Sequence, residues 1–209
     1  IVAGELVDTA LGAAASQFIR ADKIEAQPME WVWENVVPVG EFTVIMGEPG
    51  IGKSQIAVDI AARVTSGAVF PGGKAHEPGS AIILETEDDV PTVVIPRLLA
   101  AGADMRKVLV HGEPMDLSGG VEALEEEAKK LGDLKLVVLS PLRMFFGETE
   151  SSRQVDTRAR IEPLLRWANA RNVAIVGVAH KESGKKGSSG EDMAGPKAFA
   201  QRARAVHSA

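Results

Sequence analysis

Short apolar runs alternate with amphipathic segments along most of the chain. Runs rich in β-branched residues, without polar alternation, predict buried strands at 42–46, 81–84, 107–110, 136–139 and 173–178. Apolar residues at helical spacing lie between these runs and predict helices at 53–66, 90–101, 121–131 and 154–170; the second contains two prolines and the last is expected to bend at Pro163. Strands of this kind separated by helices predict an α/β fold, with a mostly parallel central sheet and helices on both faces.

The chain is expected to hold one domain over residues 25–209. Residues 1–24 are rich in Ala and Gly near their start and predict a linker or a weak helix. Trp31 and Trp33 are expected to pack at the entrance of the domain. The sequence begins at Ile1 and ends at Ala209, straight after the start of another apolar strand. We therefore expect it to be a piece of a longer polypeptide, truncated at its C-terminal end.

Composition excludes several classes of protein. The 209 residues include 23 Lys plus Arg against 29 Asp plus Glu, and the net charge of -6 excludes a globally basic nucleic-acid binder. The absence of Cys excludes disulfides, a thiol nucleophile and thiolate metal sites. No apolar run approaches the roughly 18 residues that a membrane-spanning helix needs. A cytoplasmic protein with no membrane contact is expected.

The strongest chemical signal is a complete G-x-x-x-x-G-K-S motif between a predicted strand and a predicted helix. Its glycines allow backbone N–H groups to surround a phosphate, and the helix N-terminus adds partial positive charge. Lys53 is expected to reach the β- and γ-phosphates of ATP, and the Ser54 hydroxyl to bind Mg²⁺. The motif predicts a nucleotide site made by Gly47, Glu48, Pro49, Gly50, Ile51, Gly52, Lys53, Ser54 and Gln55.

An acidic segment, 85–89, follows the next predicted strand, at the edge of the sheet where ligands gather in such folds. Glu87 is the candidate for orienting the water that attacks ATP, because hydrolysis needs a carboxylate within hydrogen-bond reach of that water. The alternative for Asp88 and Asp89 is that they cap the following helix. A P-loop kinase is disfavoured by the order of the strands and by the lack of an Arg-rich lid.

Several motifs in combination resemble a known family. They are Trp31-Val-Trp33, Pro38-Val-Gly40, GEPGIGKS, ETEDD, Pro96-Arg97-Leu98, the apolar strand that ends at Ser140-Pro141, and Val178-Ala179-His180-Lys181. Together they resemble the RecA-like AAA ATPase domain of phage and plasmid replication proteins, a group that includes the hexameric helicase RepA and is more distantly similar to DnaB. The resemblance implies a RecA-like P-loop NTPase that couples ATP hydrolysis to movement on DNA as a ring-shaped homo-oligomer.

The resemblance also implies roles for individual residues. Glu87 matches the catalytic glutamate of the family, and His180 matches the histidine that senses the γ-phosphate. Arg204 matches the finger that reaches the nucleotide of a neighbouring subunit, with Arg202 as the nearby alternative. The plainer alternatives are a surface histidine at 180 and solvated charges at the two arginines.

One position departs from the family pattern. The family has an Asp at the end of the Walker B strand, where this sequence has Ser140. Ser140 can accept a hydrogen bond at the metal site but brings no negative charge. Three explanations stay open: nucleotide binding with poor hydrolysis, compensation by Glu85 or Asp88, or a drifted or introduced change. The first would make the domain a nucleotide-binding scaffold or loader.

The segment 181–190 is rich in Gly and Ser and carries the lysines 181, 185 and 186. Loops in this region of RecA-like rings line the central channel, so the resemblance implies contact with single-stranded DNA. Lysines can contact phosphates without sequence specificity, and the segment has no aromatic residue for base stacking. The alternative is a solvated linker with scattered charge.

Overall fold

Six parallel strands form the main sheet of the computed structural model, which describes residues 19–118, 120–146, 154–180 and 199–208. Their order across the sheet is β5-β4-β6-β7-β3-β8. The strands are β3 (Phe42–Gly47), β4 (Ser80–Glu85), β5 (Val108–His111), β6 (Leu134–Ser140), β7 (Ala174–His180) and β8 (Ala205–Ser208). The five predicted strands are confirmed with small shifts in their bounds, and β8 is the apolar strand expected near the end of the chain.

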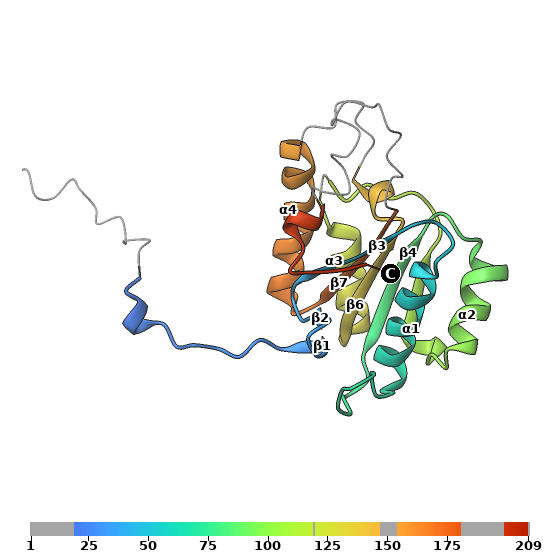
Figure 1. Ribbon diagram of the computed structural model, residues 1–209, viewed down its shortest axis with the longest axis horizontal. Coiled ribbons are helices and arrows are strands. Elements are labelled where there is room, and N and C mark those ends of the chain that lie inside the picture. The colour runs from blue at the N-terminus through green and yellow to red at the C-terminus, as the bar shows by residue number, and fades with distance from the viewer. Residues whose placement is uncertain (1–18, 119, 147–153, 181–198, 209) are drawn as a thin grey trace, which may run out of the picture.

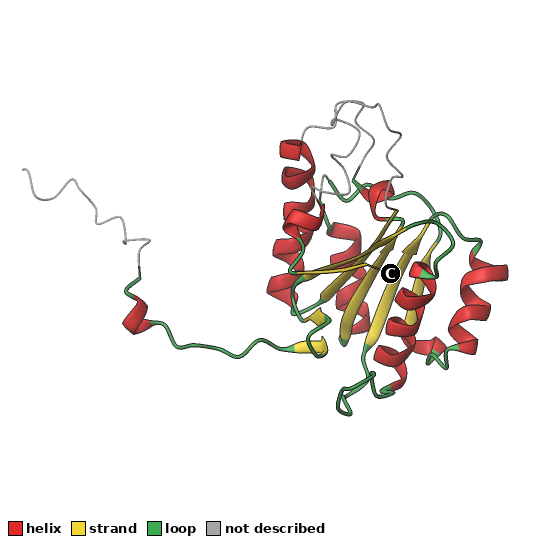
Figure 2. Cartoon of the chain, in the orientation of Figure 1, coloured by secondary structure: helices red, strands yellow, loops and turns green. Residues whose placement is uncertain are grey.

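Helices cover both faces of this sheet (Figures 1 and 2). One face packs against α1 (Lys53–Ser66) and α2 (Ile95–Ala100), and the other packs against α3 (Glu122–Leu131) and α4 (Gln154–Arg171). Three 3₁₀ turns lie in the described residues, at Ala21–Lys23, Met105–Lys107 and Leu142–Phe145. The predicted layers are therefore confirmed.

Proline shapes two of the helices. The segment predicted as one helix ending at Gly102 is divided into a π-helical turn, Val90–Val94, and the short helix α2. Pro91 and Pro96 lie at the start of these two elements, where a missing N–H removes no helical hydrogen bond. By contrast, α4 continues through Pro163 as a single element.

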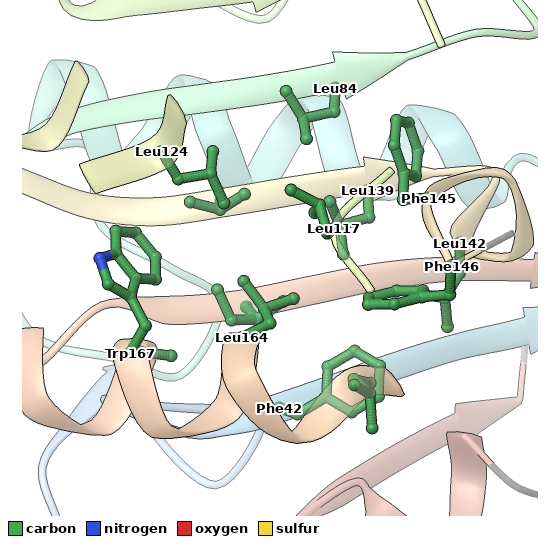
Figure 3. Close-up of a cluster of buried hydrophobic side chains, with 14 of the residues drawn as sticks. Phe42, Leu84, Leu117, Leu124, Leu139, Leu142, Phe145, Phe146, Leu164 and Trp167 are labelled. Carbon is green, nitrogen blue, oxygen red and sulfur yellow. The ribbon is translucent and has the colours of Figure 1, made fainter. Parts of the chain in front are cut away.

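The face covered by α3 and α4 holds a dense apolar core. Leu164 and Trp167 of α4 belong to the same apolar cluster as Leu124 of α3 and Leu139 of β6 (Figure 3). Gly177 of β7 faces the same core, and a Cβ there would lie 2.9 Å from the Leu142 side chain. The glycine therefore lets the turn after β6 close tightly over the sheet.

The strand order separates β3 from the strands that carry the acidic positions. β7 lies between β3 and β6, and β4 lies one strand farther out. This is the order expected for the RecA-like class, in which a strand intervenes between the P-loop strand and the Walker B strand.

The chain enters the domain through a small antiparallel pair, β1 (Trp31–Trp33) and β2 (Val37–Pro38). Trp33 stacks on Phe70 with a centroid separation of 5.2 Å, and its indole N–H donates to the carbonyl of Pro71. This packing agrees with the role expected for Trp33. Residues 19–30 are exposed and extend away from the sheet (Figure 1).

Candidate functional site

The glycine-rich loop joins the end of β3 to the start of α1. Gly50 and Gly52 have φ values of +79° and +92°, in the left-handed region that favours glycine. The first turn of a helix leaves N–H groups without helical partners, so the start of α1 offers donors to an anion. The Lys53 side chain is only 4% exposed, and its ammonium donates to the carbonyl of Glu48 at 2.7 Å. The ammonium is thus held against the loop that would receive the phosphates.

Three strands present a polar side chain toward the α1 face at their carboxyl ends. Ile83, Val138 and Val178 pack in the apolar cluster that includes α1. Side chains alternate along a strand, so the residues two positions farther on point to the same face. Those residues are Glu85 in β4, Ser140 in β6 and His180 in β7. These three polar side chains therefore lie on the side of the sheet that α1 covers.

Glu87 and His180 meet beside the glycine-rich loop. His180 pairs in register with Gly47, the first residue of the loop. The Glu87 carboxylate lies 3.1 Å from Nε2 of His180, although 93 positions separate the two residues. Because a carboxylate only accepts, Nε2 carries the proton in this contact. Nδ1 of His180 is buried without a hydrogen-bond partner in the described part of the chain.

Glu85 and Ser140 form a second pair, which is more deeply buried than the first. They are register partners on β4 and β6, and they are 4% and 3% exposed. The Ser140 hydroxyl lies beside the Glu85 carboxylate. Oε1 of Glu85 accepts the backbone N–H groups of Glu87 at 2.8 Å and Asp88 at 3.1 Å. Burial raises the pKa of Glu85, and these hydrogen bonds oppose the rise.

The other two acids of the 85–89 segment have structural partners. Asp89 accepts from the N–H of Thr92 and thereby caps the π-helical turn, as its alternative role predicts. Asp88 forms an ion pair with Arg97 of α2 at 2.5 Å. Arg97 belongs to the motif that carries the family resemblance, but no pattern in the sequence indicates this partner.

The donor set fits a Mg²⁺ ion bound with a nucleotide. The described residues contain no cluster of three or more His, Cys, Asp or Glu side chains that would form a protein-only metal site. Mg²⁺ does not require one, since it keeps several waters and binds through one or two protein oxygens together with phosphates. The Ser54 hydroxyl and the Glu85–Ser140 pair supply such oxygens, and Thr86 Oγ1 is buried without a hydrogen-bond partner among the described residues.

The two candidate finger residues lie away from the glycine-rich loop. Arg204 is exposed, and its backbone N–H donates to the carbonyl of Phe42 at the first residue of β3. At ~3.3 Å per residue, this end of β3 lies about 16 Å from Gly47. Arg202 forms an ion pair with Glu162 of α4. Arg204 is exposed and does not belong to its own chain's loop site, whereas the Arg202 side chain is partly exposed and held by Glu162.

The segment 181–190, predicted to contact DNA, lies outside the described residues. Within the described ranges, no helix has both the length and the apolar character required to cross a bilayer.

A parallel α/β sheet with a glycine-rich loop at the end of β3 defines a P-loop NTPase of the RecA-like class. Comparison with protein families matches residues 8–187 to the AAA domain. The chain therefore belongs to the AAA domain family, and the predicted fold class is confirmed. Membership also makes it a nucleotide-binding domain of NTPase type. No curated protein matches the chain. The family match ends before Arg202 and Arg204, whose roles stay predictions.

Proposed function

We propose that this domain binds and hydrolyses ATP with Mg²⁺ and couples hydrolysis to movement on DNA during replication, as a helicase-like ring. The observation that carries the proposal is the contact between Glu87 and His180 beside Gly47. It holds an exposed carboxylate, suited to orient water, next to the loop that would hold the phosphates.

The site residues divide the chemistry between them. Lys53 and the N–H groups at the start of α1 bind the phosphates, and Ser54 would hold the metal ion. The metal ion would neutralise charge on the phosphate oxygens. Glu87 orients the attacking water, and His180 senses the γ-phosphate through the same hydrogen bond that positions Glu87. Binding of ATP therefore competes for His180 and changes the orientation of Glu87.

Steady-state ATP hydrolysis with Mg²⁺, measured with and without single-stranded DNA, tests the proposal. The Lys53→Ala variant serves as the blank, and Lys129→Ala on the exposed surface of α3 is the matched lysine control. Turnover above the blank that rises with DNA supports the motor. Turnover at the blank level in the wild type, with mant-ATP binding retained, contradicts it.

The DNA contact is proposed for the segment 181–190, on the basis of its composition. Replacing Lys181, Lys185 and Lys186 by Ser is expected to weaken binding of a fluorescein-labelled single strand and to flatten its salt dependence. The log–log slope should fall by about 0.7 for each phosphate that the variant no longer neutralises. Fluorescence anisotropy at several salt concentrations measures both effects. Unchanged affinity and slope in the triple variant would contradict binding of DNA by this segment.

Ser140 favours a second candidate function, a scaffold in which ATP orders an oligomer or a loading complex. In that case nucleotide binding changes the oligomeric state while turnover stays at the Lys53→Ala level. Sedimentation velocity with and without ATP, run beside the hydrolysis assay, separates the two functions.

A further inference from the structure

The metal site lacks the carboxylate expected at the end of β6, but a carboxylate lies directly beside that position. Ser140 and Glu85 are register partners on adjacent strands, and both side chains are almost fully buried. The Ser140 hydroxyl lies close enough to the Glu85 carboxylate to favour its ionised form. A negative charge is thus available beside position 140.

Both residues face the nucleotide side of the sheet. They follow Ile83 and Val138, which pack with the helix that begins at Lys53. β4 is farther from β3 than β6 is, by one strand spacing of about 4.8 Å. Ser140 is therefore the nearer of the two to the P-loop, and Glu85 lies behind it.

The other acidic side chains of segment 85–89 contact partners other than Ser140. Asp88 pairs with Arg97, Asp89 with the N–H of Thr92, and Glu87 with His180. No described Lys, Arg or His forms an ion pair with Glu85. Burying a carboxylate without a cation is costly, so a cation at this edge of the sheet would stabilise the ionised form of Glu85.

The hydrogen bonds around Glu85 orient it for one further contact. Two carboxylate oxygens offer about four acceptor sites. The N–H groups of Glu87 and Asp88 occupy two of them. The Ser140 hydroxyl lies beside Glu85 and can donate to a third, and its oxygen then retains acceptor capacity. A metal-bound water can therefore donate to Ser140 while Ser140 donates to Glu85.

We propose that Ser140 and Glu85 together replace the missing Walker B aspartate, with Ser140 contacting a water of the Mg²⁺ ion and Glu85 supplying the negative charge behind it. Glu85 is thus a positioning residue for the metal site. The inference rests on the proposed binding of Mg-ATP, and it assigns the charge of that site to β4 instead of β6.

Metal-dependent nucleotide affinity tests the inference without relying on turnover. Binding of mant-ATP is measured in EDTA and with Mn²⁺, and Mn²⁺ binding to the protein–nucleotide complex is followed by electron paramagnetic resonance. Glu85→Gln removes the charge but keeps an oxygen for the two N–H groups. Ser140→Ala removes the hydroxyl that would link a metal-bound water to Glu85. Asp89→Asn, four residues from Glu85 along the chain, is the matched control.

Glu85→Gln and Ser140→Ala are expected to weaken Mn²⁺ binding about 10–100-fold, as loss of residues behind a metal ligand does, with nucleotide affinity in EDTA unchanged. Asp89→Asn is expected to match the wild type. The exchange variant Glu85→Gln/Ser140→Asp, which moves the charge back to β6, is expected to recover Mn²⁺ affinity.

Wild-type Mn²⁺ affinity in both Glu85→Gln and Ser140→Ala would overturn the inference while leaving nucleotide binding intact. Lack of mant-ATP binding by the wild type, with or without metal, would instead overturn the proposed function on which the inference rests. Circular dichroism tests whether each variant is folded. The two single variants decide the question even if the exchange variant does not fold.

Discussion

Glu87 lies two positions beyond the end of β4, yet its carboxylate reaches the last residue of β7. Parallel strands bring residues distant in sequence to one edge of a sheet, and this explains the contact. The residue types and their place after strands could be predicted from the sequence. The hydrogen bond between them could not, because it depends on the order of β4, β6 and β7 across the sheet.

Glu87→Gln is expected to keep ATP binding while lowering the rate of hydrolysis by about 10²–10⁴-fold. The amide can still accept from His180 but cannot orient and polarise water as a carboxylate does. Single-turnover hydrolysis and mant-ATP titration measure the two effects. Asp89→Asn, an exposed acid on the same loop, should hydrolyse ATP at the wild-type rate. Equal rates for Glu87→Gln and the wild type would remove Glu87 from the catalytic role.

Ser140→Asp alone is expected to destabilise the protein although it restores the residue of the family pattern. It would place a second buried carboxylate against Glu85, and like charges in one buried site repel. The free energy of unfolding at neutral pH should fall by about 1–3 kcal/mol. Urea unfolding measures it, and the loss should shrink as pH falls and one carboxyl group becomes protonated. A gain in stability would contradict repulsion between the two carboxylates.

Among the elements, α3 and α4 are joined by one carboxylate. Glu125 of α3 accepts from Arg171 at 2.9 Å and from the indole N–H of Trp167 at 2.9 Å. The Arg171 guanidinium, followed by the Trp167 hydrogen bond, lowers the pKa of Glu125 to about 2. A carboxyl group with a depressed pKa in the folded state stabilises that state above its ordinary pKa, and the contribution disappears as pH falls toward the folded value.

Glu125→Gln is therefore expected to lower the urea midpoint at pH 7, with the difference from the wild type narrowing as pH falls from about 4.5 to about 2. Glu126→Gln, its exposed neighbour on α3, should change the midpoint little at any pH. Urea unfolding followed by tryptophan fluorescence reports the effect directly, because Trp167 is one of the partners. A difference that stays constant across this pH range would contradict the linkage.

Helices and strands could be predicted from the sequence more completely than the contacts between side chains. Continuous apolar runs identify five of the six parallel strands, and a glycine marks the end of α1 and of α3. The division of the helix near Pro91 and Pro96 was missed, because apolar periodicity continues through both elements. β1 was also missed, since its pairing with β2 depends on a turn at Asn35, which has a φ of +60°.

At the scale of the whole molecule, the role predicted for Arg204 cannot be fulfilled within a single chain. It lies at the amino end of β3 and β8, far from its own glycine-rich loop, and its side chain is exposed. A ring of identical subunits repeats one interface. A residue that lies far from the site of its own chain can therefore contribute to the site of the next subunit. Under the proposed function, the active unit is therefore the interface between subunits.

Mixing two inactive variants tests this arrangement. Lys53→Ala lacks the phosphate-binding lysine but keeps Arg204, and Arg204→Ala keeps the loop but lacks the finger. Each alone should hydrolyse ATP at the blank rate, because an arginine finger contributes about 10³–10⁵-fold. An equimolar mixture should recover roughly a quarter of wild-type turnover if subunits assemble at random around a ring.

The matched control uses the second arginine of the same segment. Arg202 is held by Glu162 within its own chain, so Arg202→Ala alone should keep substantial turnover. If Arg202→Ala is inactive and is rescued by Lys53→Ala while Arg204→Ala stays active, the finger is Arg202. If the mixture of Lys53→Ala and Arg204→Ala stays at the blank rate at every protein concentration, each subunit completes its own site, and a ring is not required for hydrolysis.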